Sequence, residues 1–210
     1  TELDGAVSGC DVVIVCVGTP ARSDGTVNLE YVERVSEQIG GELARAAGFV
    51  AVVYRSTVPP GTVDGHLRLV LERESGHRAD EDFGVAMAPE FLREGSGVED
   101  FLDPPLTALG TRDARTLTIA SDLFSGLGRP VQALSIEAAE SLKYTCNAFH
   151  AVKVTFANEV GRIFSALGVD ARALMEVFCR DDRLNISAAY LRPGFAFGGS
   201  SLPKDLRALM

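Results

Sequence analysis

Apolar residues in the first two thirds of the chain gather in short continuous runs. Residues 11–20, DVVIVCVGTP, form such a run closed by Gly and Pro, which is typical of a buried parallel strand that leads into a loop. A second run, at residues 51–62, contains two adjacent prolines and predicts another buried strand. Shorter runs predict strands at 84–87, 105–110 and 130–134.

Helical patterns separate these runs, because apolar residues there recur every three or four positions. They predict helices at residues 29–46, 62–74 and 113–125. Regular alternation of strand and helix implies a parallel sheet covered by helices. The predicted fold class is therefore α/β, with a partial Rossmann-like parallel sheet followed by an all-helical central domain.

Ligands of such sheets bind beyond the carboxyl ends of the strands. Three loops follow predicted strands directly: GTP at 18–20, RSTVPPG at 55–61 and APEFLREG at 88–95. Any one of them taken singly is compatible with an ordinary turn. Together they mark the edge of the sheet where a site is expected.

The pattern changes after residue 134, where apolar side chains keep helical spacing from 135 to 167. One helix of this length runs roughly 45 to 50 Å, so it is expected to link two domains or two subunits. Shorter helices are predicted at 170–179 and 184–191. We therefore divide the chain into domains at 1–134 and 135–210, the second of which is helical.

The composition narrows the range of functions. A formal charge of −9 argues against general nucleic-acid binding, which relies on basic groups that neutralise phosphates. No run approaches the roughly 18 apolar residues of a membrane span, and the first residues do not resemble a signal peptide. We expect a cytoplasmic protein with no membrane partner.

Cysteine and histidine spacing predicts neither disulfides nor a metal site. The four cysteines show no CxxC pairing and lie in segments predicted to be buried, so reduced thiols are expected, and Cys146 and Cys179 are predicted to have core roles. The three histidines are far apart in sequence and lack zinc-type spacing.

Both ends of the sequence look cut. It begins at Thr1, almost inside an apolar strand, and it ends at Met210, within a helix that Pro203 opens. We expect a fragment of a longer protein.

Lys143 and Asn147 stand four residues apart in ESLKYTCN, which puts an ammonium and an amide on one helix face. An ammonium at the edge of a core can stabilise a developing oxyanion, and the amide can donate to the same oxygen. The alternative is an exposed lysine beside an ordinary asparagine.

A glycine-rich segment, RPGFAFGGSSLPKD at residues 192–205, supplies the context for this pair. Its glycines allow the backbone to approach a ligand closely, and Phe195 and Phe197 suit a flat ring or the closure of a cleft. It is no dinucleotide fingerprint, because no strand precedes it.

Four segments, in this order and spacing, resemble the successive motifs of the UDP-glucose/GDP-mannose dehydrogenase family: RSTVPPGT, APEFLREG, ESLKYTCNAFHAVKVTFANE and RPGFAFGGSSLPKD. The resemblance covers essentially the whole chain, and the residues of these motifs are most similar to those of the GDP-mannose 6-dehydrogenases. It implies an NAD-dependent enzyme that oxidises a nucleotide sugar.

The resemblance implies oxidation at C6 with two NAD in turn. The alcohol becomes an aldehyde, and a cysteine-bound thiohemiacetal then becomes a thioester that water hydrolyses to the uronate. By the same resemblance, Lys143 and Asn147 support the oxyanion, whereas Asp205 and Thr57 position water. A homodimer through the long helix is implied as well.

Further roles carried over from the family concern the general base and the ligand contacts. Glu90 or Glu94 is implied as the base, and the sequence does not separate them. Arg192 suits a diphosphate, because a guanidinium matches phosphate oxygens. Implied substrate contacts are Glu90, Phe91, Leu92, Arg93, Glu94, Lys143, Asn147, Arg192, Gly194, Phe195, Phe197 and Gly198. Implied cofactor contacts are Val17, Gly18, Thr19, Pro20, Ser56, Thr57, Glu94 and Lys204.

The chain departs from the family pattern in three ways. The glycine-rich strand-turn-helix that holds the NAD pyrophosphate and the second nucleotide-binding domain are both absent from the sequence. The family motif reads FGGSC, whereas FGGSS here puts Ser201 at the nucleophile position. An alcohol yields almost no anion near neutral pH, so activity is expected to be impaired.

These departures leave two rival functions open. Beside oxidation of a nucleotide sugar to the uronate, the first rival is a non-catalytic dimerisation or regulatory module. The second is a two-electron alcohol dehydrogenase that stops at the aldehyde.

Overall fold

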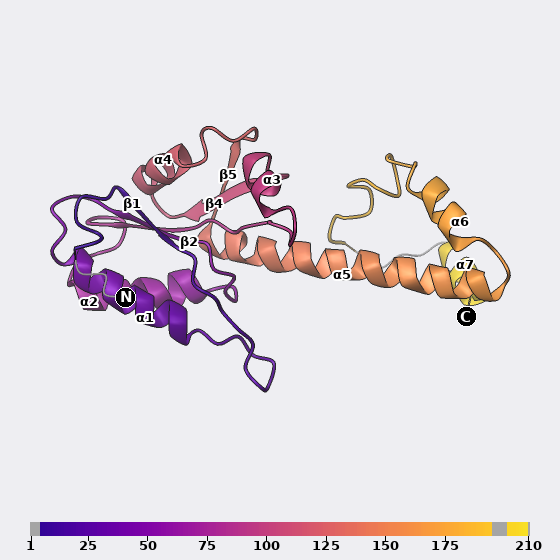
Figure 1. The fold of residues 1–210 in the computed structure, drawn as a ribbon, viewed down its shortest axis with the longest axis horizontal. Coiled ribbons are helices and arrows are strands. Elements are labelled where there is room, and N and C mark those ends of the chain that lie inside the picture. Colours follow the sequence, from indigo (N-terminus) through magenta and orange to yellow (C-terminus); the bar gives the residue numbers. More distant parts are fainter. Residues whose placement is uncertain (1–4, 195–200, 210) are drawn as a thin grey trace. The chain divides into compact units, whose positions relative to one another are not determined.

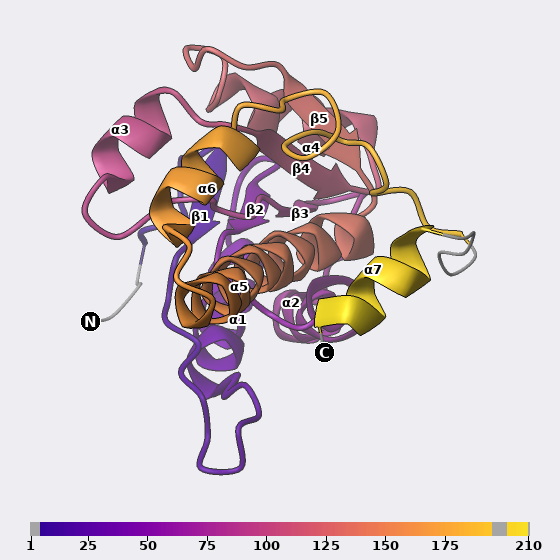
Figure 2. The same cartoon turned by 90° about the vertical axis from the view of Figure 1, so that its right-hand side faces the viewer.

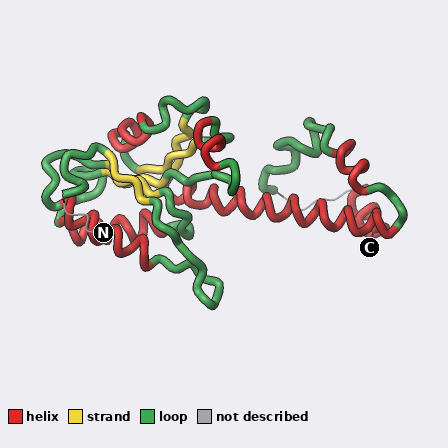
Figure 3. The backbone as a smooth tube through the Cα atoms, viewed as in Figure 1, coloured by secondary structure: helices red, strands yellow, loops and turns green. Residues whose placement is uncertain are grey.

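A sheet of five strands organises the first part of the protein (Figure 3). The computed structural model describes residues 5–194 and 201–209. The strands follow the sheet in chain order: β1 (Val12–Val15), β2 (Ala51–Tyr54), β3 (Gly84–Met87), β4 (Thr107–Thr111) and β5 (Val131–Leu134). Each predicted strand is present, and the α/β prediction is confirmed.

The strands do not all run in one direction. β1, β2 and β3 are mutually parallel, β4 pairs antiparallel with β3, and β5 is parallel to β4. The sheet is therefore mostly parallel, as predicted, but reverses at β4. The loops after β1, β2 and β3 leave from one edge, whereas β5 ends at the opposite edge.

Helices cover both faces of this sheet (Figures 1 and 2). Buried side chains alternate along β2: Tyr54 packs towards α1 and α2, whereas Val53 packs towards α4. The helices of this region are α1 (Glu30–Leu43), the π-helix η1 (Val63–Leu67), α2 (Arg68–Ser75), α3 (Gly97–Leu102) and α4 (Ala114–Asp122).

Helix α5 (Ile136–Ala166) confirms the predicted long helix. Its first turns belong to the core beside α1 and α2, where Ile136 and Ala139 are buried. Gly110 permits this close packing, because a Cβ there would lie 2.5 Å from the Ser135 carbonyl oxygen and 2.9 Å from Ile136 Cα.

The chain divides into two compact units, at residues 1–147 and 148–210. The second unit contains the rest of α5, α6 (Ala171–Phe178) and α7 (Ser201–Leu209). The predicted domain boundary between residues 134 and 135 stays a prediction.

One predicted helix is wrong, since residues 184–191 form turns. The Asp181 carboxylate accepts hydrogen bonds from the backbone of Arg183 and Leu184, and the Ser187 hydroxyl donates to carbonyls of the same two residues. Such local bonds compete with a continuous helix. Helix α3 was not predicted, because its six residues are too few to show a period.

The predicted burial of the cysteines is also wrong for three of them. Cys10, Cys16 and Cys179 are exposed, and Cys146 is half-buried; all four are free thiols. Among the described residues, no helix has both the length and the apolar character needed to cross a membrane.

Two adjacent glycines of α1 offer a test of how closely α1 and α2 pack. A Cβ on Gly40 would lie 2.6 Å from Glu74 Cβ and 3.3 Å from the Leu71 carbonyl oxygen, whereas one on Gly41 would meet nothing within 4 Å. We expect Gly40→Ala to lower the free energy of unfolding by about 1 to 2 kcal/mol, because overpacking outweighs the gain in helix propensity.

Gly41→Ala is the matched control and should raise the same free energy by up to about 1 kcal/mol. Urea unfolding of the two variants beside the wild type measures both effects. Equal stabilities would mean that α1 and α2 are not in close contact at Gly40.

Candidate functional site

The loops after β1 and β2 are held together at the carboxyl edge of the sheet. The Thr19 hydroxyl donates to the Thr57 carbonyl oxygen at 2.7 Å, and the Ser56 hydroxyl donates to the Val17 carbonyl oxygen at 2.6 Å. Ser56 is buried, so its hydroxyl serves this contact, while Gly18 between the two bonds is exposed. The two hydrogen bonds therefore fix the turn after β1 and leave its backbone accessible at Gly18.

The loop after β2 is joined to helix α5 through Glu140. This carboxylate is fully buried and accepts hydrogen bonds from the backbone N–H groups of Gly61, at 2.5 Å, and Val63, at 2.7 Å. Burial raises the pKa of Glu140, and the two N–H groups partly oppose this. The contact fixes where α5 crosses the loop.

Lys143 lies one turn further along α5 and reaches the loop after β3. Its Nζ is 2.8 Å from Glu90 Oε1, and the lysine as a whole is 8% exposed. Its ammonium also lies 5.7 Å from the centre of the Phe91 ring. An ammonium has three donors, and within the described residues Lys143 makes a hydrogen bond to Glu90 alone, so two donors remain for a ligand.

Glu90 is held in its charged form. Burial opposes ionisation, but hydrogen bonds from Lys143 and from the Leu92 amide, at 2.7 Å, outweigh it, with help from the charges of Lys143 and Arg55. The pKa of Glu90 therefore lies below its ordinary value. A charged carboxylate beside a nearly buried ammonium can accept a proton while the ammonium stabilises an oxyanion.

Arg93 is occupied by a contact that the sequence did not suggest. The buried Asp100 carboxylate accepts from Arg93 Nε at 3.1 Å, from Nη2 at 2.6 Å and from the Arg93 amide at 2.9 Å. The Ser96 hydroxyl donates to it as well, at 3.0 Å. Asp100 therefore holds the 90–96 loop against α3, and its bonds to Arg93 hold its pKa well below the usual range.

The side chains of Glu94 and Asn147 make no hydrogen bond or ion pair within residues 5–194 and 201–209, and both residues are exposed. Asn147 shares a helix face with Lys143, as its spacing predicts, but only Lys143 meets the loops. No group of three or more metal-ligating side chains occurs among the described residues.

The remaining predicted residues belong to the second unit. Ser201 is the first residue of α7 and is exposed, and Lys204 pairs with Asp205 at 3.1 Å on the same helix. Arg192 and Gly194 are exposed. The predictions for Phe195, Phe197 and Gly198 fall outside the described residues.

Sequence reasoning missed Glu140, Asp100 and Arg55. Glu140 and Arg55 had a signal, because each is a charged residue within or directly after a strongly apolar pattern. Asp100 had no such signal, since it lies in an acidic stretch between Glu99 and Asp103 that is typical of a solvent-exposed segment.

Comparison with known proteins identifies the family. Residues 1–127 match the NAD-binding domain of the UDP-glucose/GDP-mannose dehydrogenase family, and residues 137–210 match its central domain. The chain belongs to the UDP-glucose/GDP-mannose dehydrogenase family. Its members are enzymes, and their cofactor is NAD.

Individual relatives agree with this assignment. The chain is 49% identical over 209 residues to GDP-mannose 6-dehydrogenase of Pseudomonas putida and 36% identical over 211 residues to a UDP-glucose 6-dehydrogenase of Bacillus subtilis. All of the chain aligns, with 48% and 46% of these two relatives. The chain spans about half the length of the curated relatives that it matches.

A solved structure is similar as well. The crystal structure of a ternary complex of GDP-mannose dehydrogenase from Pseudomonas aeruginosa superposes with a TM-score of 0.96 at 47% identity, covering 99% of this chain and 48% of that one. The family resemblance drawn from the four motifs is therefore confirmed, and so is the fold.

The residues of the β1 loop fit the edge of a dinucleotide site. Gly18 is exposed, and nothing lies within 4 Å of where its Cβ would be, so a ligand has room to approach the backbone. Half-buried Val17 and exposed Pro20 flank it and offer apolar surface. This is a mixed surface of peptide and apolar groups suited to a nucleotide.

Asp100→Asn should loosen the loop that carries Glu90 and Glu94. The amide keeps one acceptor oxygen but puts its NH₂ opposite the Arg93 donors, so the charge and at least part of the hydrogen-bond set are lost. We expect faster hydrogen exchange at the amides of Leu92 to Ser96. Asp103→Asn, at an exposed neighbouring position, is the control and should leave exchange unchanged.

The Asp100–Arg93 contact also predicts that amide exchange in this loop depends on pH. The folded pKa of Asp100 lies below its unfolded value of 3.8. The contribution of its ionised carboxylate to the stability of this loop is therefore present above pH 3.8 and is lost as the pH falls below it. Protection of these amides, corrected for intrinsic exchange, should fall over that range in the wild type. A similar fall in Asp100→Asn would assign it to another group.

Proposed function

We propose that the protein to which this chain belongs oxidises a nucleotide sugar at C6 to the uronate, with NAD as the oxidant. The observation that carries this proposal is the Lys143–Glu90 contact of 2.8 Å, between a nearly buried ammonium and a charged carboxylate. GDP-mannose is the proposed substrate, because the relatives with that name are 46 to 49% identical to the chain.

Glu90 is the proposed base. Its charged carboxylate takes the proton of the C6 hydroxyl, while Lys143 uses its remaining donors to stabilise the oxygen. NAD, when bound, accepts the hydride from C6. Glu94 has no partner among the described residues, so its exposed carboxylate is available to contact substrate or cofactor.

The second oxidation starts from the aldehyde and needs an added oxygen. Asp205 and Thr57 are proposed to position the water that supplies it, and Asn147 is proposed to assist Lys143. In the family motif a cysteine first adds to the aldehyde, and Ser201 stands at that position. A serine hydroxyl is a poorer nucleophile near neutral pH, so we expect this half of the reaction to be slow.

Cofactor contacts are proposed for Val17 to Pro20, Thr57, Glu94 and Lys204, with Ser56 as a positioning residue because its hydroxyl is buried. Substrate contacts are proposed for the 90–94 loop and for residues 192–198. The homodimer through α5 and the cytoplasmic location stay predictions; exposed Phe149, Val152 and Phe156 on α5 support the former.

NADH stoichiometry of the intact protein tests the proposed reaction against its rivals. Two NADH per nucleotide sugar support oxidation to the uronate, and one supports a reaction that stops at the aldehyde. No NADH would favour a non-catalytic dimerisation or regulatory module.

Lys143→Ala in the intact protein should lower turnover by about a hundredfold or more, the scale for loss of one preorganised oxyanion donor. Lys153→Ala is the matched control, because Lys153 is an exposed lysine of the same helix that packs over Phe149. Steady-state kinetics with circular dichroism measure activity and folding. Wild-type turnover in Lys143→Ala, or its unfolding, would contradict the catalytic role.

Ser201→Cys in the intact protein should greatly increase uronate formation, because a thiol supplies far more anion than an alcohol. We expect slow turnover of the serine form with no thiol-bound intermediate. NADH release and mass spectrometry of the protein measure both. If the serine form makes uronate as fast as Ser201→Cys, residue 201 is not the nucleophile position that limits the reaction.

A further inference from the structure

Glu140 of α5 is a buried carboxylate to which the proposed reaction assigns no role. Its side chain is fully buried and forms no ion pair with the part of the chain that the structure describes. Backbone donors take its two oxygens instead: Oε2 accepts from the Gly61 N–H at 2.5 Å and Oε1 from the Val63 N–H at 2.7 Å. Glu140 therefore joins α5 to a segment that lies 77 to 79 positions earlier in the sequence.

The two donors lie at the start of a helical stretch. η1 and α2 follow each other without a break from residue 63 to residue 75, and the first N–H groups of a helix have no partner within it. They also carry partial positive charge, which favours an anion at this end. Thr62 at the N-cap position does not fill this role, because its hydroxyl donates to the Pro59 carbonyl oxygen at 2.6 Å. Glu140 thus caps the stretch from another helix.

This position is a costly one for a negative charge. Burial raises the pKa of Glu140, and the nearby carboxylates of Glu137 and Asp64 raise it further, whereas the Val63 and Gly61 N–H groups lower it. A buried charge is weak evidence of stability, since its desolvation offsets much of what its hydrogen bonds gain. What the carboxylate supplies, and an apolar side chain does not, is a fixed distance and direction between two backbones.

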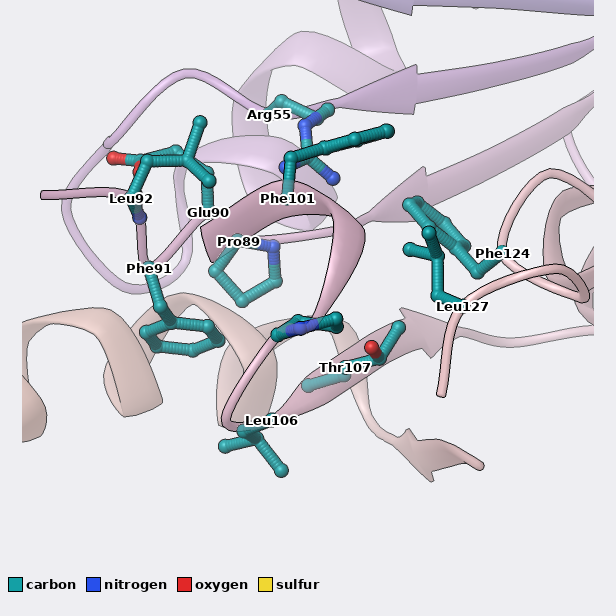
Figure 4. Close-up of a pocket in the computed structure, with 12 residues that line it drawn as sticks. Arg55, Pro89, Glu90, Phe91, Leu92, Phe101, Leu106, Thr107, Phe124 and Leu127 are labelled. Atoms are coloured by element: carbon teal, nitrogen blue, oxygen red, sulfur yellow. Dashed lines mark hydrogen bonds between the residues drawn. The ribbon is translucent and has the colours of Figure 1, made fainter. Parts of the chain in front are cut away.

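The fixed contact lies between two parts of the candidate site. Gly61 ends the loop that carries Thr57, and Lys143 follows Glu140 by one helical turn. The Lys143 ammonium is 2.8 Å from Glu90 Oε1, and the lysine is 8% exposed. Glu90 in turn lines a small pocket at the end of β3 (Figure 4). A shift of α5 along the loop after β2 would therefore carry Lys143 away from Glu90.

We propose that Glu140 is a positioning residue for the oxidation. Its carboxylate holds α5 against the loop after β2 and thereby places the Lys143 ammonium where the C6 oxygen of the sugar reacts. This role rests on the proposed function, in which Lys143 stabilises that oxygen. Misplacement of a catalytic group by about 1 Å is enough to slow a reaction by up to ~100-fold. Glu140 therefore acts on the rate through Lys143, without touching substrate or cofactor.

A double-mutant cycle in the intact protein tests this role. It follows the first NADH formed in a single turnover, with GDP-mannose and NAD both saturating. We expect Glu140→Gln to slow this step about tenfold, because the amide puts an NH₂ group against one of the two backbone donors. In the Lys143→Ala background the same change should alter the rate less than about twofold, since no ammonium is left to place. Glu137→Gln, at an exposed glutamate one turn earlier on α5, is the matched control and should keep the wild-type rate.

A second measurement needs neither cofactor nor sugar. Burial works to raise the pKa of Glu90, whereas Lys143 of α5 and Arg55 after β2 both lower it. Glu140→Gln should therefore raise the pKa of Glu90, because Lys143 withdraws while Arg55 stays in place. The NMR shift of the Glu90 carboxyl carbon, followed against pH, measures this, with the same control variant beside it.

An equal fold loss of Glu140→Gln with and without Lys143 would overturn the proposal. So would a wild-type rate, or an unchanged pKa of Glu90. If Glu140→Gln does not fold, Glu140→Asp keeps the charge on a shorter side chain and should act in the same direction in both measurements. Failure of the proposed function gives a different result: Lys143→Ala alone would keep its rate, or no NADH would form. The pKa of Glu90 then still decides whether Glu140 places Lys143.

Discussion

The buried Glu140 carboxylate is the contact on which the candidate site depends. It accepts the backbone N–H groups of Gly61 and Val63 and so fixes α5 against the end of the loop that carries Thr57. Gly110 lets the first turn of α5 lie directly on β4. Lys143 follows Glu140 by three residues on the same side of the helix, and this is why its ammonium meets Glu90.

The reversal of the sheet at β4 makes this arrangement possible. Because β5 ends at the edge opposite to the ends of β1, β2 and β3, a helix that starts there must run back along the sheet. After two turns it arrives at the edge where the loops of the parallel strands gather. Lys143 of α5 thereby meets Glu90 of the loop after β3, and Glu140 meets the backbone of the loop after β2.

The sequence predicted the strands and the long helix well, because strands buried on both faces and a 31-residue helix leave clear patterns. It did not predict the reversal at β4, since an apolar run has no direction. It also could not pair Arg93 with Asp100, because nothing local distinguishes Asp100 from its acidic neighbours. Lys143 and Glu90 were both named, but their contact spans 53 positions and required the fold.

The PEFLRE loop, residues 89–94, is held by two ion pairs. The loop supplies the anion of one pair and the cation of the other. Glu90 gives its carboxylate to a cation of α5, and Arg93 gives its guanidinium to a carboxylate of α3. In each pair the partner compensates the charge of the loop residue. The two pairs anchor the backbone on either side of Leu92. Glu94 follows directly, and its side chain makes no hydrogen bond or ion pair with the described residues. The two pairs therefore hold Glu90 in place beside Lys143 and leave the carboxylate of Glu94 without a partner among the described residues.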